Sequence, residues 1–99
     1  MQLSRVDCKP ILAVFAQRVA DYPFVRGVYG GVGDESIRLW TVLSTDDRDD
    51  RGTIYEEEGR MFDEHPDIQF DFFVLCLPRL KKPLSETIPA GFDLVSGGR

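Results

Sequence analysis

Apolar residues early in the chain recur at helical spacing, and polar ones fall between them. The apolar positions are Ile11, Leu12, Phe15, Val19 and Tyr22. This spacing predicts a helix over residues 10–21. Pro10 suits the first turn of that helix, because the N–H that proline lacks would be unsatisfied there. Residues 1–9 are expected to be a loose lead-in, and Pro23 ends the helix.

Two apolar runs with glycines between them come next. Phe24 to Tyr29 predicts a first strand, and the glycine-rich segment 30–35 predicts a tight turn that is too short for a helix. Residues 36–44 predict a second strand with apolar groups on both faces, as is typical of a central strand. Strands joined so tightly should be antiparallel. The first face of the second strand carries Ile37, Leu39 and Leu43, and the other carries Trp40 and Val42.

A charged segment over residues 45–52 separates the second strand from a further helix. Its acids are Asp46, Asp47, Asp49 and Asp50. They lack the glutamate that closes a calcium loop, which favours a solvated loop whose acids stabilise the next helix N-terminus. Thr53 to Glu56 matches a capping box and predicts that the helix begins there. The lone histidine, His65, and Pro66 end it, and a histidine at that place is typically a solvated partner of the helix dipole.

Alternating apolar residues over residues 68–77 predict a third strand. The second strand, the helix and this strand form a β–α–β unit, so the two strands should be parallel. Residues 91–96 predict a fourth strand at the edge of the sheet. The expected fold is α+β: a small mixed sheet of three to four strands with two helices on one face. Residues 1–99 fit one small domain, with a core over about 10–77 and an extended tail over 78–99.

Composition narrows the partners that the protein can have. A net charge of −5 and a pI near 4.7 disfavour nucleic acid, because an acidic surface repels phosphates. No apolar run approaches the roughly 18 residues of a membrane span, and the polar N-terminus does not resemble a signal peptide. Cys8 and Cys76 have no partners at metal-ligand spacing, and reduced thiols fit best. A cytoplasmic protein is expected.

Three features of the sequence are candidates for a functional site. The N–H groups around Gly30 and Gly31 could cradle a phosphate. A hairpin turn that needs positive φ explains the same glycines, and neither a P-loop nor a dinucleotide fingerprint is present. Asp71 lies between apolar neighbours, so it marks either a site or a half-exposed face that Gln69 shares. Arg38, on the neighbouring strand, is its expected partner and is itself a candidate to contact an anion.

The order of elements resembles the nucleotidyltransferase fold of the DNA polymerase β superfamily, in particular its short bacterial members, the minimal nucleotidyltransferases. The resemblance covers residues 10–77. In that family a strand ends in Gly-Ser, the next opens with Asp-x-Asp, and a later strand supplies a third carboxylate; together the carboxylates hold two magnesium ions. Here Gly30-Gly31 stands in place of Gly-Ser, Ser36 and Arg38 replace the paired aspartates, and Asp71 matches the third carboxylate.

The resemblance implies a relative whose catalytic centre has been lost. Gly30, Gly31, Ser36, Arg38 and Asp71 would form the vestigial site, with no catalytic residue, metal ligand or cofactor. Such a protein would act as an interaction or regulatory module, antitoxin-like, through a protein partner or a homo-oligomer. One alternative is a nucleotidyltransferase with a displaced metal site built from Asp34, Glu35 and Asp71. Another is an unrelated ferredoxin-like sandwich, in which the third strand lies between the first and second.

Overall fold

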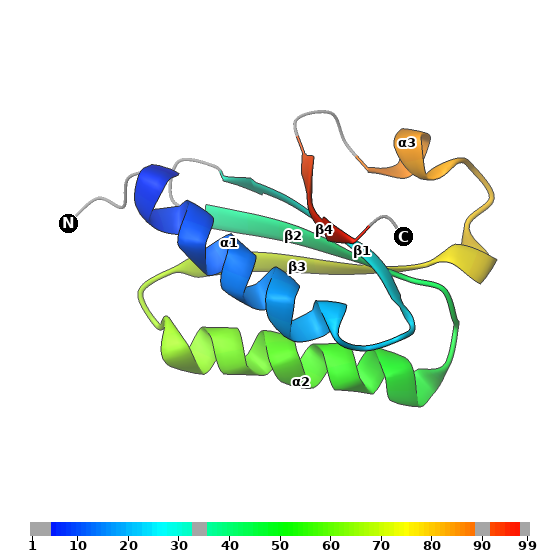
Figure 1. Cartoon of the computed structure of the whole chain (residues 1–99), viewed down its shortest axis with the longest axis horizontal. Coiled ribbons are helices and arrows are strands. Elements are labelled where there is room, and N and C mark those ends of the chain that lie inside the picture. The colour runs from blue at the N-terminus through cyan, green and yellow to red at the C-terminus, as the bar shows by residue number, and fades with distance from the viewer. Residues whose placement is uncertain (1–4, 33–35, 89–91, 98–99) are drawn as a thin grey trace.

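The computed structural model describes residues 5–32, 36–88 and 92–97. Its centre is one four-stranded sheet in the order β3-β2-β1-β4 (Figure 1). The four strands are β1 (Val25–Val32), β2 (Ser36–Leu43), β3 (Gln69–Cys76) and β4 (Asp93–Gly97). β1 is antiparallel to both of its neighbours, β2 and β4, whereas β2 and β3 are parallel. These strand directions and the fourth edge strand are confirmed. The ferredoxin-like alternative is wrong, because β1 pairs directly with β2 and β3 lies at the edge of the sheet.

Two long helices, α1 (Arg5–Ala20) and α2 (Arg48–Glu64), cover one face of the sheet. After β3 the chain forms a 3-10 turn, η1 (Leu77–Arg79), and a short helix, α3 (Leu84–Thr87), before it returns as β4. Figure 1 shows α3 on the side of the sheet away from α2. The α+β class, the mixed sheet and the two helices on one face are therefore confirmed. None of the described helices combines the length and the apolar character that a membrane crossing needs.

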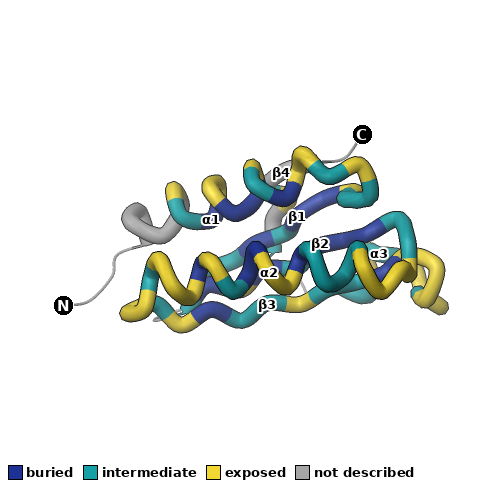
Figure 2. The backbone as a smooth tube through the Cα atoms, turned by 90° about the horizontal axis from the view of Figure 1, so that it is seen from below, coloured by how far each residue is buried: buried dark blue, intermediate teal, exposed yellow. Residues whose placement is uncertain are grey.

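The core lies between the helices and the face of the sheet that they cover (Figure 2). Every second residue of β2 points into it, as the alternation predicts. Ile37, Leu39 and Leu43 are fully buried. The helices contribute Phe15 and Val19 from α1 and Ile54 and Met61 from α2. Cys76, at the end of β3, is a free and buried thiol that packs with this cluster, whereas the side chain of Cys8 lies outside the described residues.

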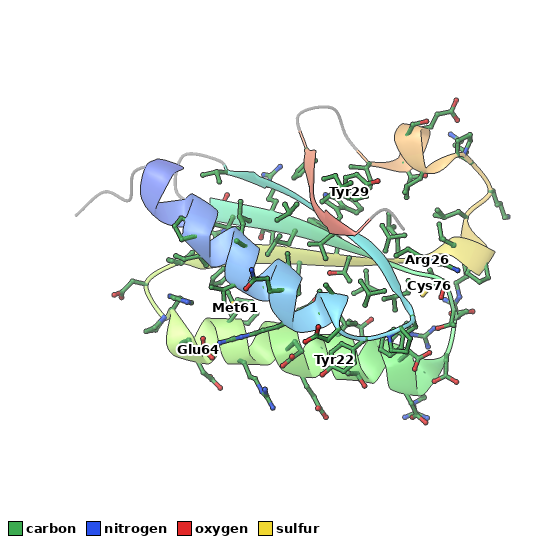
Figure 3. The ribbon with its side chains drawn as sticks, in the orientation of Figure 1. Tyr22, Arg26, Tyr29, Met61, Glu64 and Cys76 are labelled. Carbon is green, nitrogen blue, oxygen red and sulfur yellow. The ribbon has the colours of Figure 1, made fainter. Side chains whose placement is uncertain are left out.

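A polar contact joins the two covering helices. The Arg18 guanidinium of α1 donates to Glu64 Oε1 at 2.7 Å and to the sulfur of Met61 at 3.4 Å, both on α2. Figure 3 shows the labelled Met61 and Glu64 on α2 below α1. The hydrogen bond from Arg18 lowers the pKa of the Glu64 carboxyl below its ordinary value. This contact fixes how the exposed margins of α1 and α2 lie against each other.

Both helices begin earlier than their sequences predicted. α1 begins at Arg5, so residues 5–9 belong to the helix, and Pro10 lies inside it. Proline holds φ at a helical value, so a helix can pass through it with the loss of one hydrogen bond. α2 begins at Arg48 rather than Thr53, because Asp47 is the N-cap: its Oδ1 accepts from the backbone N–H groups of Asp49 and Asp50.

The capping box predicted at Thr53 is wrong, because the Asp47 carboxylate caps the helix instead. Thr53 Oγ1 donates to the carbonyl oxygen of Asp49, one turn back, instead of capping a helix end. Asp49 and Asp50 lie in the first turn, where their charges suit the helix dipole as expected. The other end was predicted correctly, since His65 is the C-cap and its N–H donates to the carbonyl oxygen of Met61.

The glycines after Tyr29 lie in a strand and not in a turn. Gly30 pairs with Leu39 of β2, and Gly31 pairs with Arg38, the residue before it in that strand. A Cβ placed on Gly30 would lie 3.0 Å from the Val95 side chain, 3.1 Å from Leu39 and 3.2 Å from Leu12. The prediction of a turn over residues 30–35 is therefore wrong for Gly30, Gly31 and Val32, which all belong to β1, and residues 33–35 lie outside the described part. Gly30 is required because α1 and β4 approach β1 closely here.

Gly30→Val should destabilise the protein, because the added side chain overpacks a site where three neighbours already meet. The expected loss in the free energy of unfolding is about 1–3 kcal/mol, measured by urea denaturation. Gly52→Ala is the matched control: a Cβ on Gly52 would meet nothing within 4 Å, so that change should stabilise α2 by up to about 1 kcal/mol. Equal effects at the two positions would contradict the packing role of Gly30.

Candidate functional site

The face of the sheet away from α1 and α2 carries the polar residues that the sequence singled out. Since side chains alternate along a strand, burial of Ile37 and Leu39 places Ser36, Arg38 and Trp40 on the opposite face of β2. Strand pairing then carries this face across the sheet. Arg38 pairs with Asp71 of β3, and Trp40 pairs with Phe73. We call this surface the second face.

An apolar row crosses the whole second face. The register aligns Leu94 with Tyr29, Tyr29 with Trp40, and Trp40 with Phe73, one residue from each strand. The rings of Trp40 and Phe73 stack, with centroids 4.2 Å apart, and Phe92 meets Trp40 edge-on at 6.2 Å. Figure 3 shows the labelled Tyr29 near β4. The aromatic packing supports the sheet on the side that the long helices leave uncovered.

A polar row lies next to the apolar one. It consists of Gly31, Arg38 and Asp71, which are aligned across β1, β2 and β3. Arg38 Nε lies 3.5 Å from Asp71 Oδ2, and the two side chains are 56% and 35% exposed. A partly solvated ion pair of this kind contributes at most about 1 kcal/mol to stability. Its importance is that the Asp71 carboxylate already has a cation beside it.

Four of the five residues of the vestigial site share one part of the second face. Ser36 lies two residues before Arg38 on β2, and Gly31 and Asp71 flank Arg38 on the neighbouring strands. Gly30 does not join them, because its missing side chain would point at Leu12, Leu39 and Val95 in the core. Its place in the site followed from the resemblance, in which Gly30-Gly31 stands in place of Gly-Ser, whereas adjacent strand residues face opposite ways.

The residues of this polar row do not fit the two magnesium ions that catalytic nucleotidyltransferases hold. Ser36 offers a hydroxyl where a carboxylate would stand, and Arg38 places a guanidinium against the remaining carboxylate of Asp71. Magnesium prefers several carboxylate and water oxygens in octahedral geometry. Within residues 5–32, 36–88 and 92–97, no three His, Cys, Asp or Glu side chains gather at metal-binding distance. Asp34 and Glu35 of the displaced-site alternative lie outside these ranges.

Sequence reasoning missed part of the second face. Tyr29 and Leu94 were not singled out, although the antiparallel pairing of β1 with its neighbours aligns them with Trp40. Phe70 and Phe72 lie on the helix-covered face, where both rings meet Phe62 of α2 edge-on, and Phe73 lies on the second face, as the alternation along this strand indicates. The row across four strands could not be read from any single strand, because it depends on the register between them.

Asp46 links the loop before α2 to the turn after β3. One of its carboxylate oxygens accepts from Arg79 Nε at 2.6 Å, and the other forms an ion pair with Arg51. The hydrogen bond from Arg79 lowers the pKa of the Asp46 carboxyl. Thr45 Oγ1 donates to Asp50 beside it at 2.7 Å. These acids hold together the ends of the β–α–β unit, which accounts for the acidic segment without a metal.

Glu58 is a buried carboxyl on α2 that the sequence did not single out. The residue is 8% exposed, and its Oε2 has no hydrogen-bond partner among the described residues. Burial raises the pKa of Glu58 to about 7. A neighbour on the same helix, Glu57, is also buried but is paired with Arg60 at 3.2 Å.

No protein-family model matches the sequence, and no curated protein matches it. The fold is similar to that of the MNT antitoxin, a minimal nucleotidyltransferase fold, in a solved complex with a tri-AMPylated HEPN toxin of Shewanella oneidensis. The alignment has a TM-score of 0.56 and 13% sequence identity, and it covers 90% of this chain and 72% of the other.

A second solved structure, also from Shewanella oneidensis, has a TM-score of 0.54 and 13% identity. It covers 88% of this chain and 71% of its own. At such low identity these comparisons show the fold alone. The predicted nucleotidyltransferase-like fold is confirmed.

Glu58 should make the stability of the protein depend on pH. Its pKa of about 7 in the folded state lies above the unfolded value of 4.5, so the folded chain holds a proton that the unfolded chain releases. Between those two pH values the free energy of unfolding should fall as pH rises, by up to about 3 kcal/mol, and then level off. Urea denaturation from pH 4.5 to pH 8 measures the fall, and Glu58→Gln should remove most of it. An unchanged slope in that variant would contradict the assignment.

Proposed function

We propose that this chain is a non-catalytic, nucleotidyltransferase-like protein that works by binding a protein partner, in the manner of an antitoxin. Its structural neighbour is an MNT antitoxin in complex with a HEPN toxin, which supports a toxin of the HEPN type as the partner. The observation that carries the non-catalytic part is the ion pair of Arg38 with Asp71. The only aspartate that matches the catalytic pattern faces a guanidinium where its relatives would hold a metal.

Binding without chemistry is consistent with the rest of the second face. Metal-assisted nucleotidyl transfer needs carboxylates that hold cations against the triphosphate, and Ser36 and Arg38 do not supply them. The second face still presents an ordered sheet surface, which includes the apolar row. The nucleotidyltransferase-like fold then serves as a rigid scaffold whose surfaces contact a partner.

The double substitution Ser36→Asp with Arg38→Asp should create divalent-cation binding. It restores the Asp-x-Asp pattern and removes the cation beside Asp71, so three carboxylates converge on the second face. Calorimetry with Mg²⁺ should show binding at least about tenfold tighter than in the wild type. The matched control, Ser36→Asn with Arg38→Asn, removes the ion pair without adding charge and should not bind. Binding of Mg²⁺ and ATP by the wild-type protein would contradict the loss of the metal site.

The partner can be tested by capture from the native host and by a growth assay. A tagged chain should retain a HEPN-type protein, identified by mass spectrometry, that arrests growth when expressed alone. Co-expression of the wild-type chain should relieve the arrest, and Asp71→Asn should relieve it equally well because no catalysis is involved. The intact mass of the partner should not change during incubation with the chain, Mg²⁺ and ATP. Relief that is lost in Asp71→Asn while binding persists would favour the catalytic alternative.

A further inference from the structure

One side of α2 presents an apolar stripe to solvent. The stripe consists of Gly52, Tyr55, Gly59 and Phe62, and we call it the α2 stripe. Its spacings of three, four and three residues place all four on one line along the helix, as in the seam of a coiled coil. Tyr55 is 53% exposed and Phe62 is 47% exposed. In Figure 1 α2 forms the lower border of the molecule, with β3 as the neighbouring edge of the sheet.

The two glycines of the α2 stripe are not required by the chain's own packing. A Cβ on Gly52 or on Gly59 would meet nothing within 4 Å, so the chain itself leaves room for a side chain at both positions. Each glycine costs about 1 kcal/mol of helix stability relative to alanine. Gly30, by contrast, is explained by three close neighbours. Glycines that carry a cost and leave open space between exposed aromatic rings suit the close approach of another backbone.

Glu58 borders the stripe and gives an independent indication of a missing neighbour. It follows Tyr55 by three residues and precedes Phe62 by four, so it adjoins both on the helix surface. Its Oε2 is buried and has no donor in the part of the chain that the structure describes. Buried acceptors in proteins are normally paired. The chain's own contacts are therefore incomplete beside the α2 stripe.

Charge indicates what kind of chain covers the α2 stripe. Asp49, Glu56 and Asp63 recur every seven residues, are exposed, and run along the flank of the stripe away from the sheet. Two copies of α2 paired antiparallel about a two-fold axis would place one acidic row against the other, which disfavours that dimer through this face. A helix with lysine or arginine along its flank would instead complement the row.

We propose that the α2 stripe docks an amphipathic helix of the protein partner. Bulky apolar side chains of that helix fill the space over Gly52 and Gly59 between the rings of Tyr55 and Phe62. Basic residues on its flank face Asp49, Glu56 and Asp63. This inference rests on the proposed function only in taking the partner to be a protein, and it assigns the helix-in-groove mode of recognition to one surface.

A synthetic helix tests this surface directly. The probe is a labelled three-heptad peptide with leucine at the a and d positions and lysine at e and g, and its twin carries glutamate in place of lysine. Fluorescence anisotropy with the full chain should show the lysine peptide binding at least about tenfold tighter than its twin. Gly59→Leu should weaken that binding about tenfold or more while the protein unfolds at the same or a higher urea concentration.

Charge reversal supplies the sharpest control. Glu56→Lys with Asp63→Lys should make the glutamate twin the better ligand. Asp21→Lys with Asp67→Lys changes the net charge equally at exposed positions outside α2, and it should leave the preference for the lysine peptide. Equal effects of the two pairs, or binding that Gly59→Leu does not weaken, would overturn the proposal. A dimer in light scattering that disappears in Gly59→Leu would also overturn it, because a second copy would then be the occupant.

The natural partner separates this inference from the proposed function. If a HEPN-type protein is captured by the wild type and Gly59→Leu reduces its capture about tenfold, both stand. If Gly59→Leu and the charge-reversed chain capture it as well as the wild type does, the docking site is wrong and the function stands. If no such protein is captured but the peptides behave as expected, the function is wrong and the α2 stripe remains a helix-docking surface.

Discussion

The burial of alternate β2 residues under two helices is the constraint on which the rest of the structure depends. Ile37, Leu39 and Leu43 point into the core between the sheet and α1 and α2. A shift of one residue would exchange the two faces and would place Arg38 and Trp40 under the helices. Because β2 is paired on both sides, its orientation is imposed on β1 and β3. The polar row and the apolar row of the second face follow from that one strand.

The same arrangement leaves the outward positions of β2 without a packing role in the core. The core needs only the inward residues of β2, so the outward positions 36 and 38 are free to change without loss of the fold. A serine and an arginine there keep the strand extended and solvated. The Arg38–Asp71 pair balances the charge of the Asp71 carboxylate on that face.

Periodicity in the sequence predicted what depends on local spacing, and it failed where distant segments meet. The strands β2 and β3, their parallel pairing and the end of α2 at His65 followed from alternation, loop length and a proline. The start of α2 did not, because Asp47 and Thr53 are both good caps and only the folded loop decides between them. Gly30 was taken for a turn residue since nothing local indicates that Leu12 and Val95 close on it. Likewise, the sequence does not show that Gly52 and Gly59 of α2 have open space around them, because this depends on the folded structure.

The position of β4 has a consequence for how the molecule opens. This strand is five residues long, comes last in the chain and pairs with β1 alone. The sheet of β1, β2 and β3 keeps its own ladder hydrogen bonds and its helical cover without it. Short edge strands are among the elements that unfold locally, at a fraction of the global free energy. Detachment of β4 would expose the outer backbone N–H and C=O groups of β1 as a free antiparallel edge.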